Sequence, residues 1–293
     1  MSNINNDLAL FIEEEHKESG EVIHLLPTLR QTIQPKVLLR LGVFVPTLKS
    51  TEKGGRKSHS IDATESLSRL SIVEGEGYNQ IQIYGPRLDM DTDFKVWVGI
   101  VYALSNKKLS TDGQLELNFP EFAKYCGIES KRIDRQLKER FDASLTRIAR
   151  TNISFIKKIP GTDDQITINM HLVESTYYDS STGKIIIKPN AKLNTLYRVD
   201  GKTRLYLKSL QKLARKESAQ ALYLFLAELP NTFYRIGFDR LRERLQLTSH
   251  LGNQNATVKK ALLQLKDIGF LEYSVEKENG DYVLTILKRN PRL

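Results

Sequence analysis

From residue 93 onward the chain repeats one order of predicted elements, and this repetition constrains the fold more than any other feature. An apolar helix, a short strand, a second helix, a turn, a longer amphipathic helix and two strands are predicted in 93–173 and again in 218–287. Phe119 and Ile128 in the first copy, and Phe238 and Leu247 in the second, are both nine residues apart. Self-similarity of this kind indicates two units of one supersecondary design.

The repeated order of elements is that of a winged helix-turn-helix. In the second copy, Gly269 stands where a left-handed helix cap is needed, and Asn279-Gly280 is the pair preferred in a type I′ hairpin turn. Two short helices around a polar turn could also be a plain helical core, but the hairpin that follows favours the winged helix. We therefore expect an α+β chain with two tandem winged helix-turn-helix domains related by internal duplication.

Length and local composition predict how the chain is divided. A chain of 293 residues suits two domains better than one. We expect an acidic, weakly ordered N-terminal arm in 1–35 and an N-terminal winged-helix domain in 36–199, which serves dimerisation and accessory DNA contact. The C-terminal winged-helix domain, 200–293, is expected to be the principal DNA-binding part. Within the first domain, 37–48 is apolar and could be a strand or a packing arm, and the Lys/Gly/Ser-rich stretch 49–60 is expected to be a flexible loop.

Positive charge gathers in the last third of the chain. The net charge is +9, and residues 201–293 carry 17 Lys and Arg against 9 Asp and Glu. A basic domain attracts a polyanion by neutralising phosphates and releasing counterions. A solvated basic surface is the alternative interpretation.

The start of the third helix in the second copy carries side chains suited to reading DNA. A helix is predicted from about Asn255 to residue 268, and in a helix-turn-helix this helix lies in the major groove. Amides and lysines at its start can pair with base edges. The candidate base-reading residues are Asn253, Gln254, Asn255, Thr257, Lys259 and Lys260. Asn255 could also cap the helix, and the two roles can coexist. The sequence thus predicts a protein that binds double-stranded DNA sequence-specifically.

Other cations are assigned by their place in the two units. The candidate phosphate contacts of the second unit are Arg235, Arg240, Arg242, Arg244 and Lys277. The corresponding helix start of the first unit carries Lys131, Arg132 and Arg135 beside Glu129 and Asp134. Such a mixed surface suits a dimer or partner contact at least as well as an accessory DNA contact.

Sequence motifs typical of enzymes, metal sites and membrane spans are incomplete or missing in this sequence. Gly201-Lys202-Thr203 resembles the end of a phosphate loop, but Leu196 stands where the first glycine is required. Tyr177-Tyr178 could suggest a DNA-nicking tyrosine, yet isolated histidines favour plain strand residues. The single cysteine, Cys126, is expected to be a buried inert thiol. We expect no catalytic residue, no metal and no cofactor. No apolar run could span a membrane and the N-terminus is acidic, so the chain is expected to stay in the cytoplasm.

Six stretches carry a resemblance to a known family. They are 39–49 (LRLGVFVPTLK), 85–99 (GPRLDMDTDFKVWVG), 122–128 (FAKYCGI), 217–223 (ESAQALY), 254–258 (QNATV) and 268–273 (IGFLEY). Together with the two winged-helix units, they resemble the replication initiator proteins of iteron-containing bacterial plasmids, most of all the RepFIB-type initiators. Relatives of this type carry a longer C-terminal tail than this chain, which puts any function of that tail in doubt here.

The resemblance implies a function and partners. It implies a protein that binds direct repeats (iterons) at the origin, promotes origin opening and recruits the host initiator and replicative helicase. It also implies repression of the protein's own promoter, with dimers that repress and monomers that initiate. A dedicated winged-helix transcriptional repressor without an initiator role is the alternative, and sequence alone does not separate the two. A tyrosine-dependent nicking initiator is a third possibility.

Overall fold

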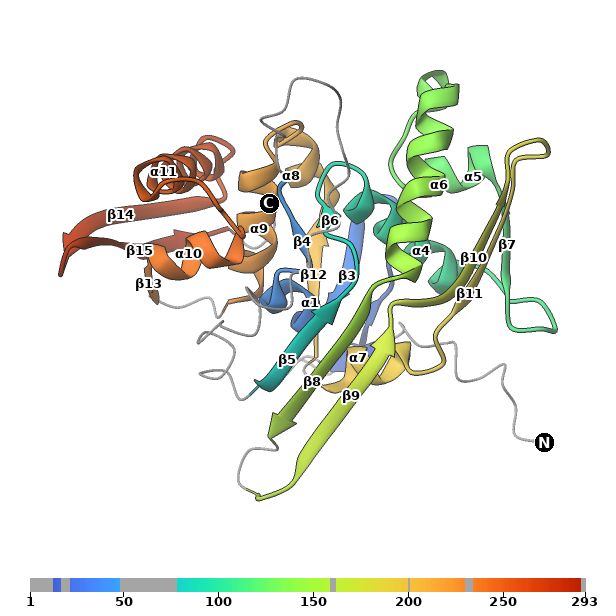
Figure 1. Ribbon diagram of the computed structural model, residues 1–293, viewed down its shortest axis with the longest axis horizontal. Helices are drawn as coiled ribbons and strands as arrows, with labels where there is room; N and C mark the ends of the chain where they lie inside the picture. Colours follow the sequence, from blue (N-terminus) through green and yellow to red (C-terminus); the bar gives the residue numbers. More distant parts are fainter. Residues whose placement is uncertain are drawn as a thin grey trace.

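The computed structural model describes residues 13–16, 22–47, 78–158, 162–199, 201–229 and 234–290. Two winged-helix units lie at opposite ends of its longest axis, and a middle layer of short helices and strands lies between them (Figure 1). One continuous hydrophobic core runs through all three parts. The fold is therefore α+β with tandem winged helices, as the sequence predicts.

The first winged-helix unit follows the predicted order of helices. Its elements are α4 (Asp93–Asn106), β7 (Leu115–Asn118), α5 (Phe119–Tyr125), the 3₁₀ turn η1 (Ser130–Arg132), α6 (Arg135–Ala149), β10 (Val173–Asp179) and β11 (Lys184–Pro189). Side-chain caps fix two of the helix starts, since Asn118 accepts from the Glu121 amide and Asp134 from the Leu137 amide. The predicted helix start at Lys131 is thereby corrected to Arg135.

The second unit repeats this design. Its elements are α9 (Glu217–Glu228), β13 (Tyr234–Gly237), α10 (Phe238–Arg244), α11 (Leu251–Asp267), β14 (Leu271–Glu278) and β15 (Asp281–Arg289). The sheet orders β10-β11-β7 and β14-β15-β13 are equivalent, because the second hairpin strand lies centrally in both. Gly269 has the predicted left-handed conformation (φ 81°), and positive φ at Asn279 and Gly280 fits the predicted type I′ turn. The internal duplication is confirmed.

The wing of the first unit differs from the prediction. The two strands expected directly after the third helix exist as β8 (Asn152–Lys158) and β9 (Gln165–His171). They form a separate sheet with β5 (Tyr78–Tyr84), in the order β5-β8-β9. The wing is instead β10 and β11. Ile185 and Ile187 of β11, both fully buried, stand opposite Leu117 and Leu115 of β7, and this apolar match selects the later hairpin.

The expected N-terminal arm is corrected in part. β1 (Glu13–His16) and β2 (Val22–Leu25) pair antiparallel. β3 (Gln31–Pro35) pairs antiparallel with β12 (Lys202–Tyr206), and Gln34 is buried where its side-chain oxygen accepts from the Trp97 indole at 2.7 Å. β3, which was predicted to belong to the arm, therefore pairs with β12, which was predicted to belong to the C-terminal domain. The predicted boundaries at 35/36 and 199/200 do not separate these two strands.

The rest of the middle layer joins the units. Its elements are α1 (Lys36–Leu41), β4 (Phe44–Val45), β6 (Leu88–Asp89), α7 (Leu193–Val199) and α8 (Leu207–Lys212). The apolar segment 37–48, expected to be a strand or an arm, thus forms mainly a helix that ends at Gly42 in the left-handed region (φ 68°). The loop expected in 49–60 lies outside the described residues. Cys126 is buried as expected, and burial raises the pKa of its thiol.

Candidate DNA interface

Helix α11 holds the candidate base-reading residues. It begins at Leu251, one helical turn before the predicted start near Asn255, and His250 is its N-cap. Asn255 therefore does not cap the helix, which corrects that alternative. Asn253, Gln254 and Asn255 instead lie in its first turns, where a recognition helix contacts bases.

Burial fixes which face of α11 is turned outward. Val258, Ala261, Leu262 and Leu265 are buried, and the helix packs on α9 and α10. On the opposite face, Asn253, Ala256, Lys259 and Lys260 are exposed. Leu251 and Leu263 are 57% and 51% exposed. Sequence reasoning missed Ala256 and Leu263, although their helical spacing from Asn253 and Lys260 was a usable signal.

Asn255 is held by an arginine of the preceding helix. Its Oδ1 accepts from Nη1 of Arg242 at 2.7 Å. The same guanidinium binds both carboxylate oxygens of Asp281, the first residue of β15 after the turn of the wing, at 3.0 and 2.6 Å. The hydrogen bond from Arg242 lowers the pKa of Asp281, and the carboxylate in turn raises the pKa of Arg242. One guanidinium thus connects α10, α11 and the wing.

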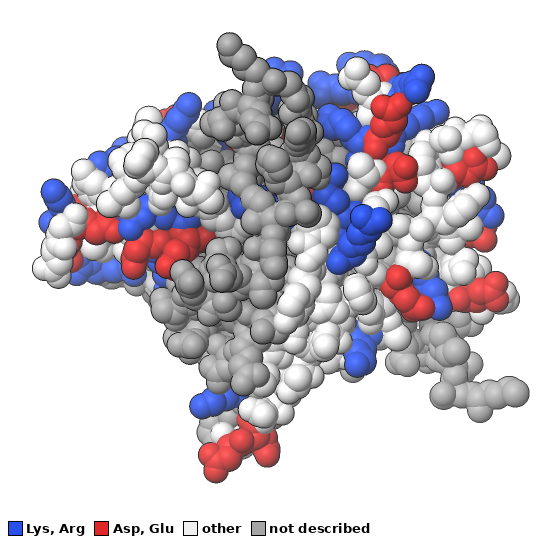
Figure 2. Space-filling model, viewed as in Figure 1, with Lys and Arg blue, Asp and Glu red and all other residues white. Residues whose placement is uncertain are grey.

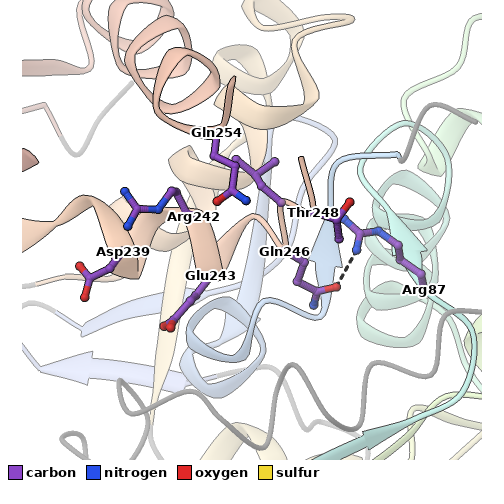
Figure 3. A pocket seen from close by; sticks show the side chains of 8 residues that line it. Arg87, Asp239, Arg242, Glu243, Gln246, Thr248 and Gln254 are labelled. Carbon is purple, nitrogen blue, oxygen red and sulfur yellow. Dashed lines mark hydrogen bonds between the residues drawn. The ribbon is translucent and has the colours of Figure 1, made fainter. Parts of the chain in front are cut away.

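Gln254 and Thr257 are oriented by backbone carbonyls. The Gln254 side-chain amine donates to the Ser249 carbonyl, and the Thr257 hydroxyl donates to the Asn253 carbonyl at 2.9 Å. Figure 3 shows Gln254 beside a cavity of about 260 Å³ that Arg242 and Glu243 also line. Gln254 is therefore turned toward the helix-turn-helix turn, while Asn253 points to solvent.

The two lysines of α11 differ in their surroundings. Lys259 lies 3.5 Å from the ring centroid of Tyr282 in the wing. Its hydrogen bond and charge lower the pKa of the Tyr282 hydroxyl. Lys260 is exposed on the outer face of the helix. Of these two candidate base-reading lysines, the structure thus places Lys259 against the wing and Lys260 on the outer face of α11.

Arg244, predicted to contact phosphate, is in the interior. Arg244 is 2% exposed, and its Nε donates to the Leu39 carbonyl at 3.0 Å. Burial lowers the pKa of its guanidinium to about 9. A guanidinium enclosed in this way does not reach DNA, so the assignment of Arg244 was wrong. The reason is that the segment around α1 covers this end of α10, which no local pattern of charge reveals.

The other predicted phosphate contacts are nearer the surface. Arg235 is exposed and forms an ion pair with Glu278 of the wing. Arg240 lies half-buried with its guanidinium 5.6 Å from the Phe225 ring centroid. Arg242 is engaged by Asp281 and Asn255, and Lys277 is exposed on β14. Of the five predicted phosphate contacts, only Arg235 and Lys277 are therefore exposed.

The turn of the second helix-turn-helix is attached to the middle layer. Gln246, the turn residue with a left-handed backbone (φ 49°), donates to the Gly42 carbonyl at 3.3 Å. Its side-chain oxygen accepts from Arg87 at 2.8 Å, the hydrogen bond drawn in Figure 3. Desolvation lowers the pKa of Arg87 to about 10. Arg87 and Gln246, which sequence reasoning did not single out, thus fix the turn before α11 relative to the rest of the molecule.

The corresponding surface of the first unit has mixed charge. Lys131 pairs with Glu129 at 2.8 Å, and Arg135 pairs with Glu139 at 2.8 Å, while Arg132 is exposed. Figure 2 shows blue and red side chains intermingled around the end of α6 at the upper right. In Figure 1, α6 and α11 both lie along the upper side of the view, at opposite ends of the molecule.

The described residues also bear on other kinds of site. Within the described ranges, no group of three or more His, Cys, Asp or Glu side chains could hold a metal ion. No described helix is both long and apolar enough to cross a membrane. Tyr177 and Tyr178 lie in β10 as the predicted strand residues.

Comparisons with solved structures give matches of low similarity. Domains 2 and 3 of RctB match 87% of this chain and 98% of their own, at 11% identity and a TM-score of 0.48. The WH1 domain of MSBI1.176, a replication protein isolated from a multiple sclerosis patient, covers 47% of this chain at 13% identity and a TM-score of 0.26.

Sequence relatives are much nearer. Replication protein RepA of Salmonella typhi is 44% identical over 99% of this chain and 82% of its own length. RepFIB replication protein A of Escherichia coli is 45% identical over 94% of this chain and 85% of its own length. The model of the WH1 part of the initiator replication proteins matches residues 67–227. The two winged helices have the topology that this match leads one to expect. The chain therefore belongs to the family of initiator replication proteins, which includes the RepFIB type of plasmid replication protein.

Proposed function

We propose that the protein initiates plasmid replication by binding direct repeats (iterons) at the origin, with α11 in the major groove as the base-reading helix. Bound in this way, it promotes origin opening, recruits the host initiator and replicative helicase, and represses its own promoter. Self-association sets the balance between a monomer and a dimer, and the protein works in the cytoplasm.

The observation that carries this proposal is the outward face of α11. Amide, lysine and apolar side chains follow one another along it at Asn253, Ala256, Lys260 and Leu263. Amides and lysines bind base edges, and small apolar groups can contact a thymine methyl. The buried face of the same helix fixes this orientation, and the surrounding third of the chain is basic.

The first unit is proposed to serve dimerisation and accessory DNA contact through Lys131, Arg132 and Arg135. Two of these cations have acidic neighbours on the same surface, Glu129 and Glu139. Such pairs weaken the attraction for phosphate, so we expect this surface to contribute less to DNA affinity than α11 does.

The salt dependence of binding tests the DNA-binding part of the proposal. The full chain is titrated against a duplex with direct repeats from the plasmid that carries its gene, at several salt concentrations. For roughly 6 to 10 phosphates neutralised, log K falls with log salt at a slope of about −5 to −9. Lys277→Ala, which removes an exposed candidate phosphate contact of the wing, should lower that slope by about one unit, and Arg135→Ala, which removes an exposed cation of α6, should lower it less. A slope shallower than about −2 would contradict a DNA-binding function.

Autonomous replication separates an initiator from a dedicated repressor. A small plasmid that carries the gene and its flanking repeats, and no other replication origin, should replicate in a bacterial host. Loss of replication on deletion of the gene, with recovery when the gene is supplied elsewhere, is the expected result. Promoter repression without any replication would favour the repressor.

A further inference from the structure

The contacts of Asn255 determine which part of its side chain is available to DNA. Arginine carries only donors, so the group that faces Arg242 must be the amide oxygen. The amine, Nδ2, then points away from Arg242, and no acceptor for it occurs among the described residues. Asn255 is half-buried, so part of it reaches the surface.

The guanidinium that holds this oxygen is itself fixed. Its side chain is 11% exposed and is bound at two points by the Asp281 carboxylate. A bidentate arginine–carboxylate pair has a defined plane, which fixes where the remaining N–H of Arg242 points. Rotation of the Asn255 amide by half a turn would set its amine against this cation and leave a donor unpaired.

An asparagine held in this way has one of its two hydrogen-bonding groups already engaged. Bidentate recognition of adenine requires the amide oxygen to accept from N6 while the amine donates to N7. The charged donor of Arg242 takes one of the two lone pairs of Oδ1 and fixes the position of this oxygen, so Nδ2 is the group of Asn255 that is left without a bond among the described residues. A single donor can bind a purine N7, the O6 of guanine or the O4 of thymine, whereas cytosine offers only an amino donor in the major groove.

We propose that Arg242 is a positioning residue that fixes Asn255 as a donor-only reader of the major groove, so that Asn255 selects a base-edge acceptor and does not bind adenine bidentately. This inference rests on the proposed function, since it concerns the helix that reads the origin repeats. It changes the role of Arg242 from a phosphate contact to a determinant of specificity, through Asn255 and from within the fold.

Selection from a randomised duplex library tests the inference whatever the base sequence of the repeat is. The full chain is incubated with duplexes whose central 20 or so base pairs are random, and the bound fraction is sequenced. At one position, the unchanged protein should disfavour cytosine on the contacted strand by about 3- to 10-fold, the worth of one net hydrogen bond.

Two substitutions should change this preference in different directions. Asn255→Asp keeps the shape and the contact with Arg242 but replaces the donor with an acceptor, so cytosine or adenine, which present amino groups, should become favoured there. Arg242→Met removes the contact and frees the amide, so adenine should gain about 3- to 10-fold at the same position. The double variant Arg242→Met/Asp281→Asn, which leaves no unpaired carboxylate, should give the same shift as Arg242→Met.

Arg235→Met is the matched control. It also removes an arginine and an ion pair of the wing, that with Glu278, but Arg235 has no contact with Asn255. We expect weaker binding to all sequences with an unchanged base preference. If Asn255→Asp and Arg242→Met also leave every base preference unchanged while the unchanged protein is selective, Arg242 does not position a reader, and the proposed function stands. If the unchanged protein enriches no sequence, the proposed function fails and this inference fails with it.

Discussion

The two winged-helix units share one topology but use the same positions differently. Each ends its second helix with the same hydrogen bonds, since the Ile128 amide donates to the Ala123 carbonyl and the Leu247 amide to the Arg242 carbonyl. The left-handed residue of this turn is Gly127 in the first unit and Gln246 in the second. The fold thus fixes the backbone of the turn, while the side chains decide whether the turn faces solvent or the rest of the molecule.

The two units differ most at the seventh residue of their second helix. In the first unit it is Tyr125, half-buried, whose hydroxyl donates to Glu121. In the second it is Arg244, buried and bonded to the Leu39 carbonyl. We expect Arg244→Ala to lower the free energy of unfolding by about 3 kcal/mol, because it leaves a cavity and unpaired carbonyls.

Tyr125→Phe is the matched change in the first unit. It removes one partly exposed hydrogen bond and should cost about 1 kcal/mol or less. Chemical denaturation of both variants gives the comparison. An Arg244→Ala variant as stable as Tyr125→Phe would mean that Arg244 does not hold the second unit to the middle layer.

The turn residues give the next effect. A Cβ at Gly127 would meet nothing within 4 Å, so Gly127→Ala isolates the cost of a left-handed backbone (φ 76°), about 1–2 kcal/mol. In Gln246→Gly, relief of that strain is offset by loss of the bonds to Gly42 and Arg87, and the change should stay within about 1 kcal/mol. Thermal melting measures both variants. A gain of the full relieved strain in Gln246→Gly, about 1–2 kcal/mol, would show that the Gln246 side chain contributes nothing at the junction.

The smallest expected effect concerns the wing of the second unit. The hydrogen bond from Arg242 lowers the pKa of Asp281 below its ordinary value of 3.8. This carboxylate therefore contributes stability that is present above pH 3.8 and is lost as the pH falls through its lowered pKa. A carboxyl NMR titration should find this pKa below 3.8 in the unchanged protein and higher in Arg242→Met. An unchanged pKa in the variant would remove Arg242 as the cause.

Local signals explain why the second unit was predicted well. Each of these signals depends only on residues close to it in the sequence. They are the left-handed Gly269, the turn pair Asn279-Gly280 and the four-residue spacing between the buried Val258 and Leu262. The amides and lysines of α11 were likewise visible in the sequence. Their orientation was not, because the bond from Arg242 to Asn255 depends on how two helices and a turn meet.

Long-range pairing explains the errors. β3 is short and isolated in the sequence, and its partner β12 lies beyond the whole first unit. The wing of the first unit was missed because β8 and β9 intervene and pair with β5 instead. Arg244 looked like a surface charge because the segment that covers it comes from a distant part of the chain.

We propose that α11 reads DNA sequence and that α6 does not. Asn253 and Gln136 are both exposed amides in the first turn of the third helix of their unit. The most direct measurement is a binding titration of Asn253→Ala and Gln136→Ala, as full chains, against the selected duplex and its single-base variants. We expect Asn253→Ala to lose about 1–3 kcal/mol of discrimination at one base pair and Gln136→Ala to keep the discrimination of the unchanged protein. Loss of discrimination in Gln136→Ala with none in Asn253→Ala would contradict the claim and move the reading helix to the first unit.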